Sequence, residues 1–273
     1  MDTIEMQSKI KAAKKSLLDF CLAAGFGHPS SAYSLSEILA VLYYNVLRYN
    51  KFTSHPDMNN RDRLIISNNH ASIMTFPYLH DIGFITDDEY KTIMQAGTKR
   101  VNYTNAKFAG MEFISGSLGI GLGVAVGIAK AAQLNNKDHL TFCIVGDCEC
   151  AEGSIWESVM FAGHNHLNNL IVIFDNNNLG VTDYACNMIS MEPIESRWAS
   201  FGFETRRVNG HDLEQLNNVF ADIRARKSDK PLCIVADTIK GKGVDFMENK
   251  LLWHGAIPKG ENIALAYAQL EEE

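Results

Sequence analysis

The chain has 273 residues, of which 46% are hydrophobic, and its formal net charge is -7 at pH 7. This length is enough to bury a full hydrophobic core, and no apolar run reaches the roughly 20 residues that a membrane-spanning helix needs. The negative charge and the dispersed basic residues argue against a general nucleic-acid-binding surface. The N-terminus lacks the profile of a secretion signal and the six cysteines stand in apolar surroundings, so we expect a reduced, cytoplasmic protein.

Hydrophobic periodicity divides the chain into alternating helices and strands. Apolar residues at helical spacing, bounded by turn residues, predict helices over residues 4–24, 34–47, 117–134, 154–164 and 212–226. Short apolar runs predict buried strands over residues 64–67, 141–145, 170–174 and 232–236. This alternation is typical of a parallel β-sheet with helices on both faces, so we expect one α/β domain spanning residues 1–273.

Polar residues follow two of the predicted strands. Gly146 and Asp147 come directly after the strand at 141–145, and Asn177 lies in the Asn-rich turn after the strand at 170–174. In open α/β sheets ligands collect beyond the carboxyl ends of the strands, so these side chains are expected to converge. A carboxylate, an amide oxygen, a main-chain carbonyl and phosphate oxygens suit a hard divalent cation such as Mg²⁺. We therefore predict a cradle for a metal and a diphosphate.

Further motifs occur in an order that resembles the N-terminal, diphosphate-binding part of transketolase, and they cover nearly all of the chain. They are Gly-His-Pro at 27–29, Arg-Asp-Arg-Leu-Ile-Ile-Ser-Asn-Asn-His-Ala-Ser at 61–72, Ser-Gly-Ser-Leu-Gly at 115–119, Glu-Gly at 152–153, Ala-Gly-His at 162–164, and the closing Lys-Gly-Lys-Gly to Trp-His-Gly block at 240–255. The resemblance implies thiamin diphosphate chemistry, in which a two-carbon ketol unit passes from a ketose, such as a sugar phosphate, to an aldose.

Matched residue by residue, the resemblance implies that Asp147 and Asn177 are side-chain ligands of Mg²⁺, Ca²⁺ or Mn²⁺, and that the Leu179 carbonyl is a main-chain ligand. Asn176 and Asn178 flank Asn177, so the amide ligand could lie one position away. The resemblance also places the cofactor against a further set of residues: His70, Gly116, Leu118, Gly146, Cys148, Glu152 and His254. Glu152 matches a carboxylate at a subunit interface in the family, although a helix N-terminal acid would look the same.

Four residues match family positions near the substrate or the diphosphate, and we expect them to be catalytic: His28, His70, His254 and Tyr103. Imidazole titrates near neutral pH, so the histidines can hydrogen-bond oxygens or relay protons, and the sequence does not divide these roles. Tyr103 replaces a histidine, and a phenol stays protonated at neutral pH. Because Ile120 also replaces the usual glutamine, we expect a non-standard sugar substrate.

Two backbone positions also depart from the family. Cys148 and Asn69 replace glycines, so two tight backbone positions carry side chains; asparagine tolerates a left-handed backbone at modest cost, and cysteine is less suited to it. The isolated Cys-x-Cys at 148–150 is only a weak indication of redox or metal-binding thiols.

The fused members of the family continue into a pyrimidine-binding domain, whose glutamate activates the cofactor, and this chain ends before that domain. We therefore expect a second, transketolase C-terminal-type subunit, a heterotetramer with two copies of each chain, and little activity of this chain alone. Two alternatives remain. One is a degenerate, non-catalytic assembly subunit, and the other is the decarboxylating subunit of a 2-oxo acid dehydrogenase, against which the Gly-His-Pro and Trp-His-Gly blocks speak.

Overall fold

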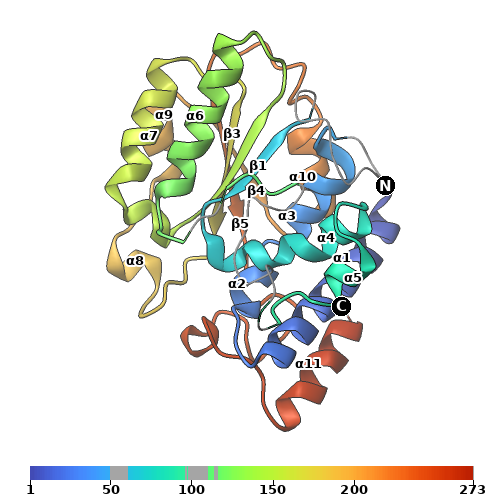
Figure 1. Cartoon of the computed structure of the whole chain (residues 1–273). Helices are drawn as coiled ribbons and strands as arrows, with labels where there is room; N and C mark the ends of the chain where they lie inside the picture. The colour runs from blue at the N-terminus through green and yellow to red at the C-terminus, as the bar shows by residue number, and fades with distance from the viewer. Residues whose placement is uncertain (50–60, 96, 98–109, 114–115, 273) are drawn as a thin grey trace.

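The computed structural model describes residues 1–49, 61–95, 97, 110–113 and 116–272. Its five described strands form one parallel sheet in the order β1-β2-β3-β5-β4 (Figure 1). The strands are β1 (Arg63–Ile66), β2 (Thr141–Gly146), β3 (Leu170–Asn176), β4 (Glu204–Asn209) and β5 (Leu232–Asp237). The predicted α/β class is confirmed, and the four predicted strands agree with β1, β2, β3 and β5 to within two residues at each end.

The helices that the structure describes connect and cover these strands. They are α1 (Thr3–Ala24), α2 (Pro29–Tyr33), α3 (Ser36–Val41), α4 (Thr75–Asp81), α5 (Asp87–Tyr90), α6 (Ile120–Leu134), α7 (Gly153–His164), α8 (Ala185–Met188), α9 (Ile194–Ser200), α10 (Leu213–Phe220) and α11 (Glu261–Glu272). A π-helical turn, Leu42–Val46, continues α3, and 3-10 turns occupy Asn69–Met74, Cys148–Ala151 and Leu251–Trp253.

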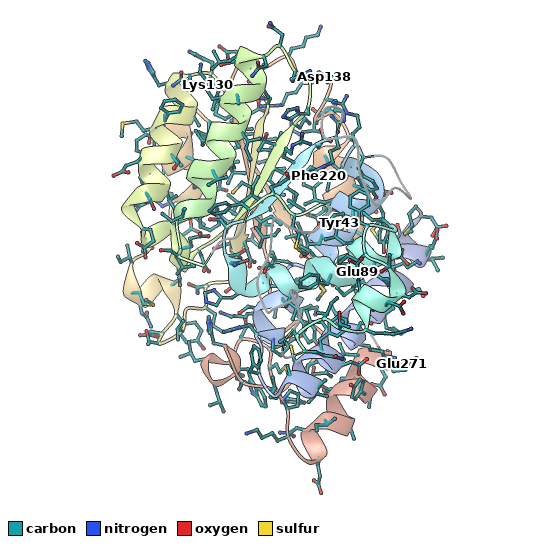
Figure 2. The ribbon with its side chains drawn as sticks, in the orientation of Figure 1. Tyr43, Glu89, Lys130, Asp138, Phe220 and Glu271 are labelled. Atoms are coloured by element: carbon teal, nitrogen blue, oxygen red, sulfur yellow. The ribbon has the colours of Figure 1, made fainter. Side chains whose placement is uncertain are left out.

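Strand alternation sends side chains to two separate cores. On one face, Phe142 and Ile171 pack with α1, α3 and α10, and on the other, Val145 and Val172 pack under α6, α7 and α9 (Figure 1). Figure 2 shows Tyr43 and Phe220 within the molecule and Asp138 and Glu271 at its surface. The result is the three-layer arrangement expected for a parallel sheet buried on both faces.

The register aligns the carboxyl ends of the strands. Gly146 lies opposite Asp175, and Asn176 lies opposite Asp237, so the loops after β2, β3 and β5 begin side by side. The predicted meeting of the residues after β2 and β3 is therefore found in the structure.

The backbone is not left-handed at either of the two positions where the chain replaces a family glycine. Cys148 and Asn69 each begin a 3-10 turn, and neither is among the described non-glycine residues with positive φ, which are Met94, Asn136, His166, Asn178 and Asn249. The backbone at both positions therefore has ordinary dihedral angles that any residue can adopt.

Two further properties concern the described part of the chain as a whole. No helix there combines the length and the apolar character needed to cross a membrane. All six cysteines fall within the described residues and are free thiols.

Candidate functional site

A cleft lies where the loops after β1, β2, β3 and β5 meet. Eight residues that the sequence predicted for the site line it: His70, Leu118, Gly146, Asp147, Cys148, Asn177, Leu179 and His254. Gly146 is confined there, because an added Cβ would lie 3.3 Å from the Asn68 Cβ. The fold thus gathers segments that are far apart in the sequence at one edge of the sheet.

Asp147 follows β2 and is almost completely buried. Its Oδ1 accepts a hydrogen bond from the Cys148 amide at 2.6 Å, whereas its Oδ2 has no hydrogen-bond partner among the residues that the structure describes. Burial, together with the nearby Asp175 carboxylate, raises the pKa of Asp147 to about 6, and the Lys240 ammonium acts in the opposite direction. A buried carboxylate oxygen without a partner is costly, so this position favours a bound cation.

Asn177 is held in place by Asp175, which is buried at the end of β3. Asp175 Oδ2 accepts from Asn177 Nδ2 at 3.0 Å and from Ser34 Oγ at 2.9 Å, and the Thr238 hydroxyl donates to Oδ1. The amide oxygen of Asn177 consequently faces the turn, where it accepts from the Leu179 amide at 3.1 Å.

The neighbouring asparagines are directed elsewhere. Asn176 Nδ2 donates to Asp237 at 2.7 Å, and Asn178 Oδ1 accepts from the Cys186 amide at 3.1 Å. Of the three asparagines, Asn177 alone lines this cleft.

Three half-buried histidines cluster at the cleft. The ring centroids of His28 and His70 are 4.9 Å apart, and each lies 5.5 Å from the centroid of His254. Burial, the neighbouring rings and Lys240 lower the pKa of His28 to about 4 and that of His254 to about 3; burial and Lys240 lower the pKa of His70 too. At neutral pH all three rings are therefore uncharged and able to exchange a proton with an oxygen.

Lys240 links the two parts of the cleft and was not predicted as a site residue, although its Lys-Gly-Lys block carried part of the resemblance. Its buried ammonium donates to the Leu179 carbonyl and to His254 Nδ1, both at 2.9 Å. Burial lowers the pKa of Lys240, and Asp147 and Asp175 oppose that shift. Lys240 therefore orients the His254 ring and partly compensates two carboxylates.

Glu149 was also not predicted, because its partners Ser67 and Gly119 lie far from it in the sequence. Its buried carboxylate accepts from the Gly119 amide at 2.7 Å, from the Ser67 hydroxyl, and from the Gly146 amide at 3.0 Å. It ties the ends of β1 and β2 to the turn before α6.

Among the described residues, two predicted ones belong neither to the cleft lining nor to the histidine cluster, of which His28 is a member without lining the cleft. Gly116 and Glu152 are exposed and do not line the cleft, although Glu152 immediately precedes α7. Tyr103 lies outside the described residues.

The residues present fit a hard divalent cation. Asp147 offers a buried, unpartnered carboxylate oxygen, and an amide oxygen of Asn177 and the carbonyl of Leu179 lie on the adjoining turn. Oxygen donors of these three kinds suit Mg²⁺, Ca²⁺ or Mn²⁺.

The parallel sheet, the oxygen-rich turn and the histidine cluster define a cofactor-binding α/β domain, and comparisons with known proteins specify its class. A family model described as "Transketolase, thiamine diphosphate binding domain" matches residues 6–271. The chain belongs to the transketolase family.

Its relatives include single subunits and whole enzymes. It is 31% identical over 272 residues to a subunit of apulose-4-phosphate transketolase from Phocaeicola vulgatus, covering 100% of this chain and 95% of that protein. It is 31% identical over 271 residues to 6-deoxy-6-sulfo-D-fructose transketolase subunit SqwG of a Clostridium species, covering 99% and 98%. Transketolase of Mus musculus is 34% identical over 266 residues, which are 94% of this chain but 42% of the mouse protein.

The solved structure of Campylobacter jejuni transketolase has a TM-score of 0.89 and 31% identity to this chain, covering 99% of it and 43% of that enzyme. The chain therefore spans less than half the length of the full-length transketolases that it matches. These findings confirm the expected relationship to split transketolases and the expected function of a transketolase subunit that binds thiamin diphosphate.

Proposed function

We propose that this chain supplies the diphosphate-binding half of a transketolase active site that two different chains build together. The observation that carries the proposal is one cleft that combines an oxygen-rich cradle around Asp147 with a cluster of three uncharged histidines. A cradle of this kind suits a metal-bound diphosphate, and uncharged imidazoles suit proton exchange with sugar oxygens.

The roles divide between the two parts of the cleft. Asp147, Asn177 and the Leu179 carbonyl would hold Mg²⁺, and the Lys240 ammonium adds positive charge toward the diphosphate. Thiamin diphosphate, when bound, supplies the electron sink for breaking and forming the carbon–carbon bond of the ketol unit.

The histidines would act on the sugar. His28, His70 and His254 are uncharged near neutral pH, so each can take a proton from a sugar hydroxyl or return one to a carbonyl oxygen. Lys240 donates to His254 Nδ1, which keeps that nitrogen an acceptor and fixes the ring.

A partner subunit would complete the cleft. Four exposed apolar side chains are each two positions in the sequence from a residue of the cleft or of the histidine cluster: Phe26, Ile120, Val181 and Leu252, next to His28, Leu118, Leu179 and His254. We call these four side chains the apolar rim. Such an unpartnered rim is typical of a protein interface. The relatives named as subunits support a split enzyme, for which we propose two copies of each chain in a cytoplasmic complex.

We further propose a ketose other than the common pentose phosphates as the substrate. Two relatives are named for apulose-4-phosphate and for 6-deoxy-6-sulfo-D-fructose. In this chain Tyr103 and Ile120 replace a histidine and a glutamine of the family pattern, and Ile120 is exposed at the start of α6. A phenol and an imidazole favour different hydroxyl patterns.

A substrate panel tests the function. The complex with a co-expressed pyrimidine-domain subunit should transfer ketol units and prefer another ketose over xylulose 5-phosphate by roughly tenfold or more. Tyr103→His should shift this preference toward xylulose 5-phosphate, and Tyr103→Phe, which lacks only the hydroxyl, should weaken turnover of the preferred ketose. If wild type and both variants use the common pentose phosphates as well as any other ketose, the substrate proposal is refuted. If no donor–acceptor pair gives ketol transfer, the proposed function is refuted.

A further inference from the structure

A buried polar chain runs from α1 to the loop that carries Lys240. Lys14 Nζ donates to Glu37 Oε1 at 3.1 Å, and Glu37 Oε2 lies 2.8 Å from His211 Nδ1. On the other side of the ring, His211 Nε2 accepts a hydrogen bond from the Ile239 amide at 2.8 Å. Ile239 immediately precedes Lys240.

The ring of His211 has one defined tautomer in this arrangement. Because the Ile239 amide is a donor, Nε2 must be the accepting nitrogen, and the proton on Nδ1 is donated to Glu37. Burial alone would raise the pKa of Glu37, but Lys14 and His211 together lower it to about 2, so the acceptor stays a carboxylate. The chain of hydrogen bonds therefore fixes the ring at both nitrogens.

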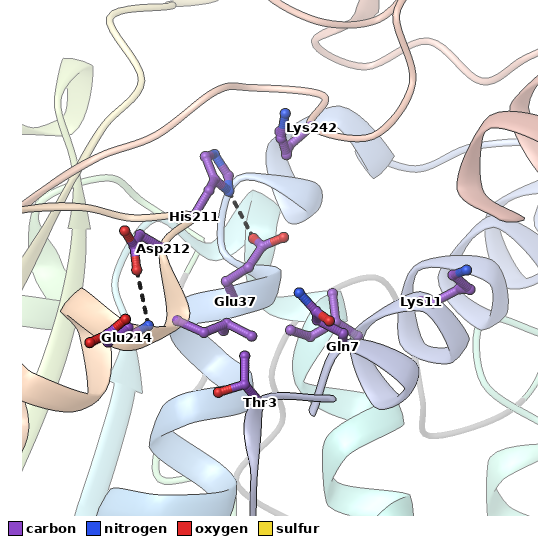
Figure 3. A pocket seen from close by; sticks show the side chains of 10 residues that line it. Thr3, Gln7, Lys11, Glu37, His211, Asp212, Glu214 and Lys242 are labelled. Atoms are coloured by element: carbon purple, nitrogen blue, oxygen red, sulfur yellow. Dashed lines mark hydrogen bonds and ion pairs between the residues drawn. The ribbon is translucent and has the colours of Figure 1, made fainter. Parts of the chain in front are cut away.

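His211 and Glu37 line a pocket of about 430 Å³ between α1, the start of α10 and the loop after β5 (Figure 3). Lys242 lines the same pocket, whereas Lys240, two residues earlier, lines the cofactor cleft. The loop after β5 therefore separates this pocket from the cofactor cleft, and His211 contacts it from the pocket side.

Other contacts hold the loop at points around this anchor. The Gly241 amide donates to the Ser30 carbonyl at 2.9 Å, and the Asn249 amide donates to the Lys240 carbonyl at 3.0 Å. The His211 contact is the side-chain contact closest to Lys240 on the N-terminal side, and it acts on the backbone from which the ammonium extends.

We propose that His211, oriented by Glu37, is a positioning residue that sets the place of Lys240 in the cofactor cleft. A rotation of the Ile239–Lys240 peptide would displace the Lys240 side chain and with it the ammonium. Its hydrogen bonds to the Leu179 carbonyl and to His254 Nδ1 are of normal length, so such a displacement would weaken both. This inference rests on the proposed function, in which Lys240 faces the diphosphate.

The first test needs no cofactor. In the full chain labelled with ¹⁵N, the chemical shift of His254 Nδ1 reports the hydrogen bond from Lys240. His211→Phe should move that shift toward the value of Lys240→Met, and His211→Gln, whose amide can still accept from the Ile239 amide, should restore most of the wild-type shift. His164→Phe, at an exposed position on α7, is the matched control and should leave it unchanged. An unaltered His254 shift in folded His211→Phe would overturn the proposal.

The second test is a double-mutant cycle on cofactor affinity, measured by calorimetry with thiamin diphosphate and Mg²⁺ in the two-subunit complex. His211→Phe should weaken binding about tenfold in the wild-type background and not at all in the Lys240→Met background, because the effect passes through Lys240. If the losses of affinity from the two substitutions multiply in the double variant, His211 acts independently of Lys240 and has a merely structural role, which would overturn the proposal. If His211→Phe fails to fold, His211→Asn, which cannot reach both partners, takes its place in the cycle.

The two tests separate this inference from the proposed function. Wild-type complex that binds no thiamin diphosphate would refute the function, while the His254 shift would still decide whether His211 positions Lys240.

Discussion

Lys240 is the one lysine or arginine lining the cofactor cleft in the described structure, whereas Asp147, Glu149 and Asp175 all line it with carboxyl groups. Glu149 and Asp175 each accept several hydrogen bonds, but Asp147 Oδ2 accepts none among the described residues. The excess of carboxylates over ammonium groups is a charge environment that a divalent cation would neutralise. Asp147 is accordingly the position at which removing one charge should matter most.

Asp147→Asn keeps the shape of the side chain and removes its charge. We expect it to weaken the Mg²⁺-dependent binding of thiamin diphosphate by at least about a hundredfold, since even residues that only support metal ligands account for 10–100-fold. Calorimetric titration of the two-subunit complex with and without Mg²⁺ measures this, and Asp138→Asn, on an exposed aspartate, is the control. Unchanged affinity in Asp147→Asn would rule out Asp147 as a ligand.

The same variant makes a prediction about pH. The pKa of Asp147 is raised from 3.8 to about 6 in the folded, metal-free chain. Below about pH 4 the group is protonated in both states and contributes nothing; between pH 4 and 6 the unfolded chain alone releases its proton, so folding is increasingly disfavoured. The stability of Asp147→Asn relative to wild type should therefore increase from pH 4 to 6 and then level off. Urea unfolding at several pH values in EDTA measures it, and a difference that shrinks as the pH rises would contradict the burial argument.

Among the site residues, the sequence predicted those that belong to compact motifs and did not predict those whose role depends on a partner far away in the sequence. His28, His70 and Asp147 each stand within a recognisable block of the chain. The role of Lys240 depends on Leu179, 61 positions away, which only the folded sheet brings within hydrogen-bond distance. Spacing along the chain could not show that contact.

The close approach of α6 to the end of β1 depends on a glycine. A Cβ at Gly121 would lie 2.7 Å from the Ser67 Cα, which is backbone and cannot move aside. Ser67 also donates to Glu149, so displacement of α6 would disturb a contact that ties the ends of β1 and β2 together.

Gly121→Ala should therefore destabilise the chain by about 1–3 kcal/mol, the usual cost of overpacking. Gly127→Ala on the same helix is the matched control, since a Cβ there meets nothing within 4 Å and alanine favours a helix over glycine by up to about 1 kcal/mol. Chemical denaturation of both variants should give changes of opposite sign. Two changes of the same sign would show that Gly121 is not required for this packing.

Strands with a continuous apolar run were predicted well, including β1 at one edge of the sheet. β4, at the other edge, was not predicted because it is largely polar, with Val208 its one buried side chain. Its arginines form ion pairs instead, including Arg207 with Asp237. The helix predicted over 212–226 ends at Phe220, so the prediction was wrong for residues 221–226. Asp212 was a reliable start signal, since its side chain caps the Glu214 and Gln215 amides.

For the molecule as a whole, the apolar rim follows the cleft along the chain: Val181 lines the cleft, and Phe26, Ile120 and Leu252 are each two positions from a residue of the cleft or of the histidine cluster. These four side chains expose apolar surface, whereas most large apolar side chains elsewhere are buried in the two cores. A surface of this kind would shed water when a second subunit covers it, which would also lower the dielectric around the cofactor.

Leu252→Ser tests this role of the rim. The Leu252 side chain is 79% exposed, so the variant should leave the stability of the isolated chain within about 0.5 kcal/mol of wild type. If the partner buries Leu252, the lost apolar contact should weaken the association of the two subunits by roughly tenfold or more. Leu134→Ser is the matched control, because Leu134 is 71% exposed at the end of α6 remote from the cleft. Calorimetric titration of one subunit into the other compares the two variants. A loss of affinity in both, or in neither, would show that the partner does not dock on the apolar rim.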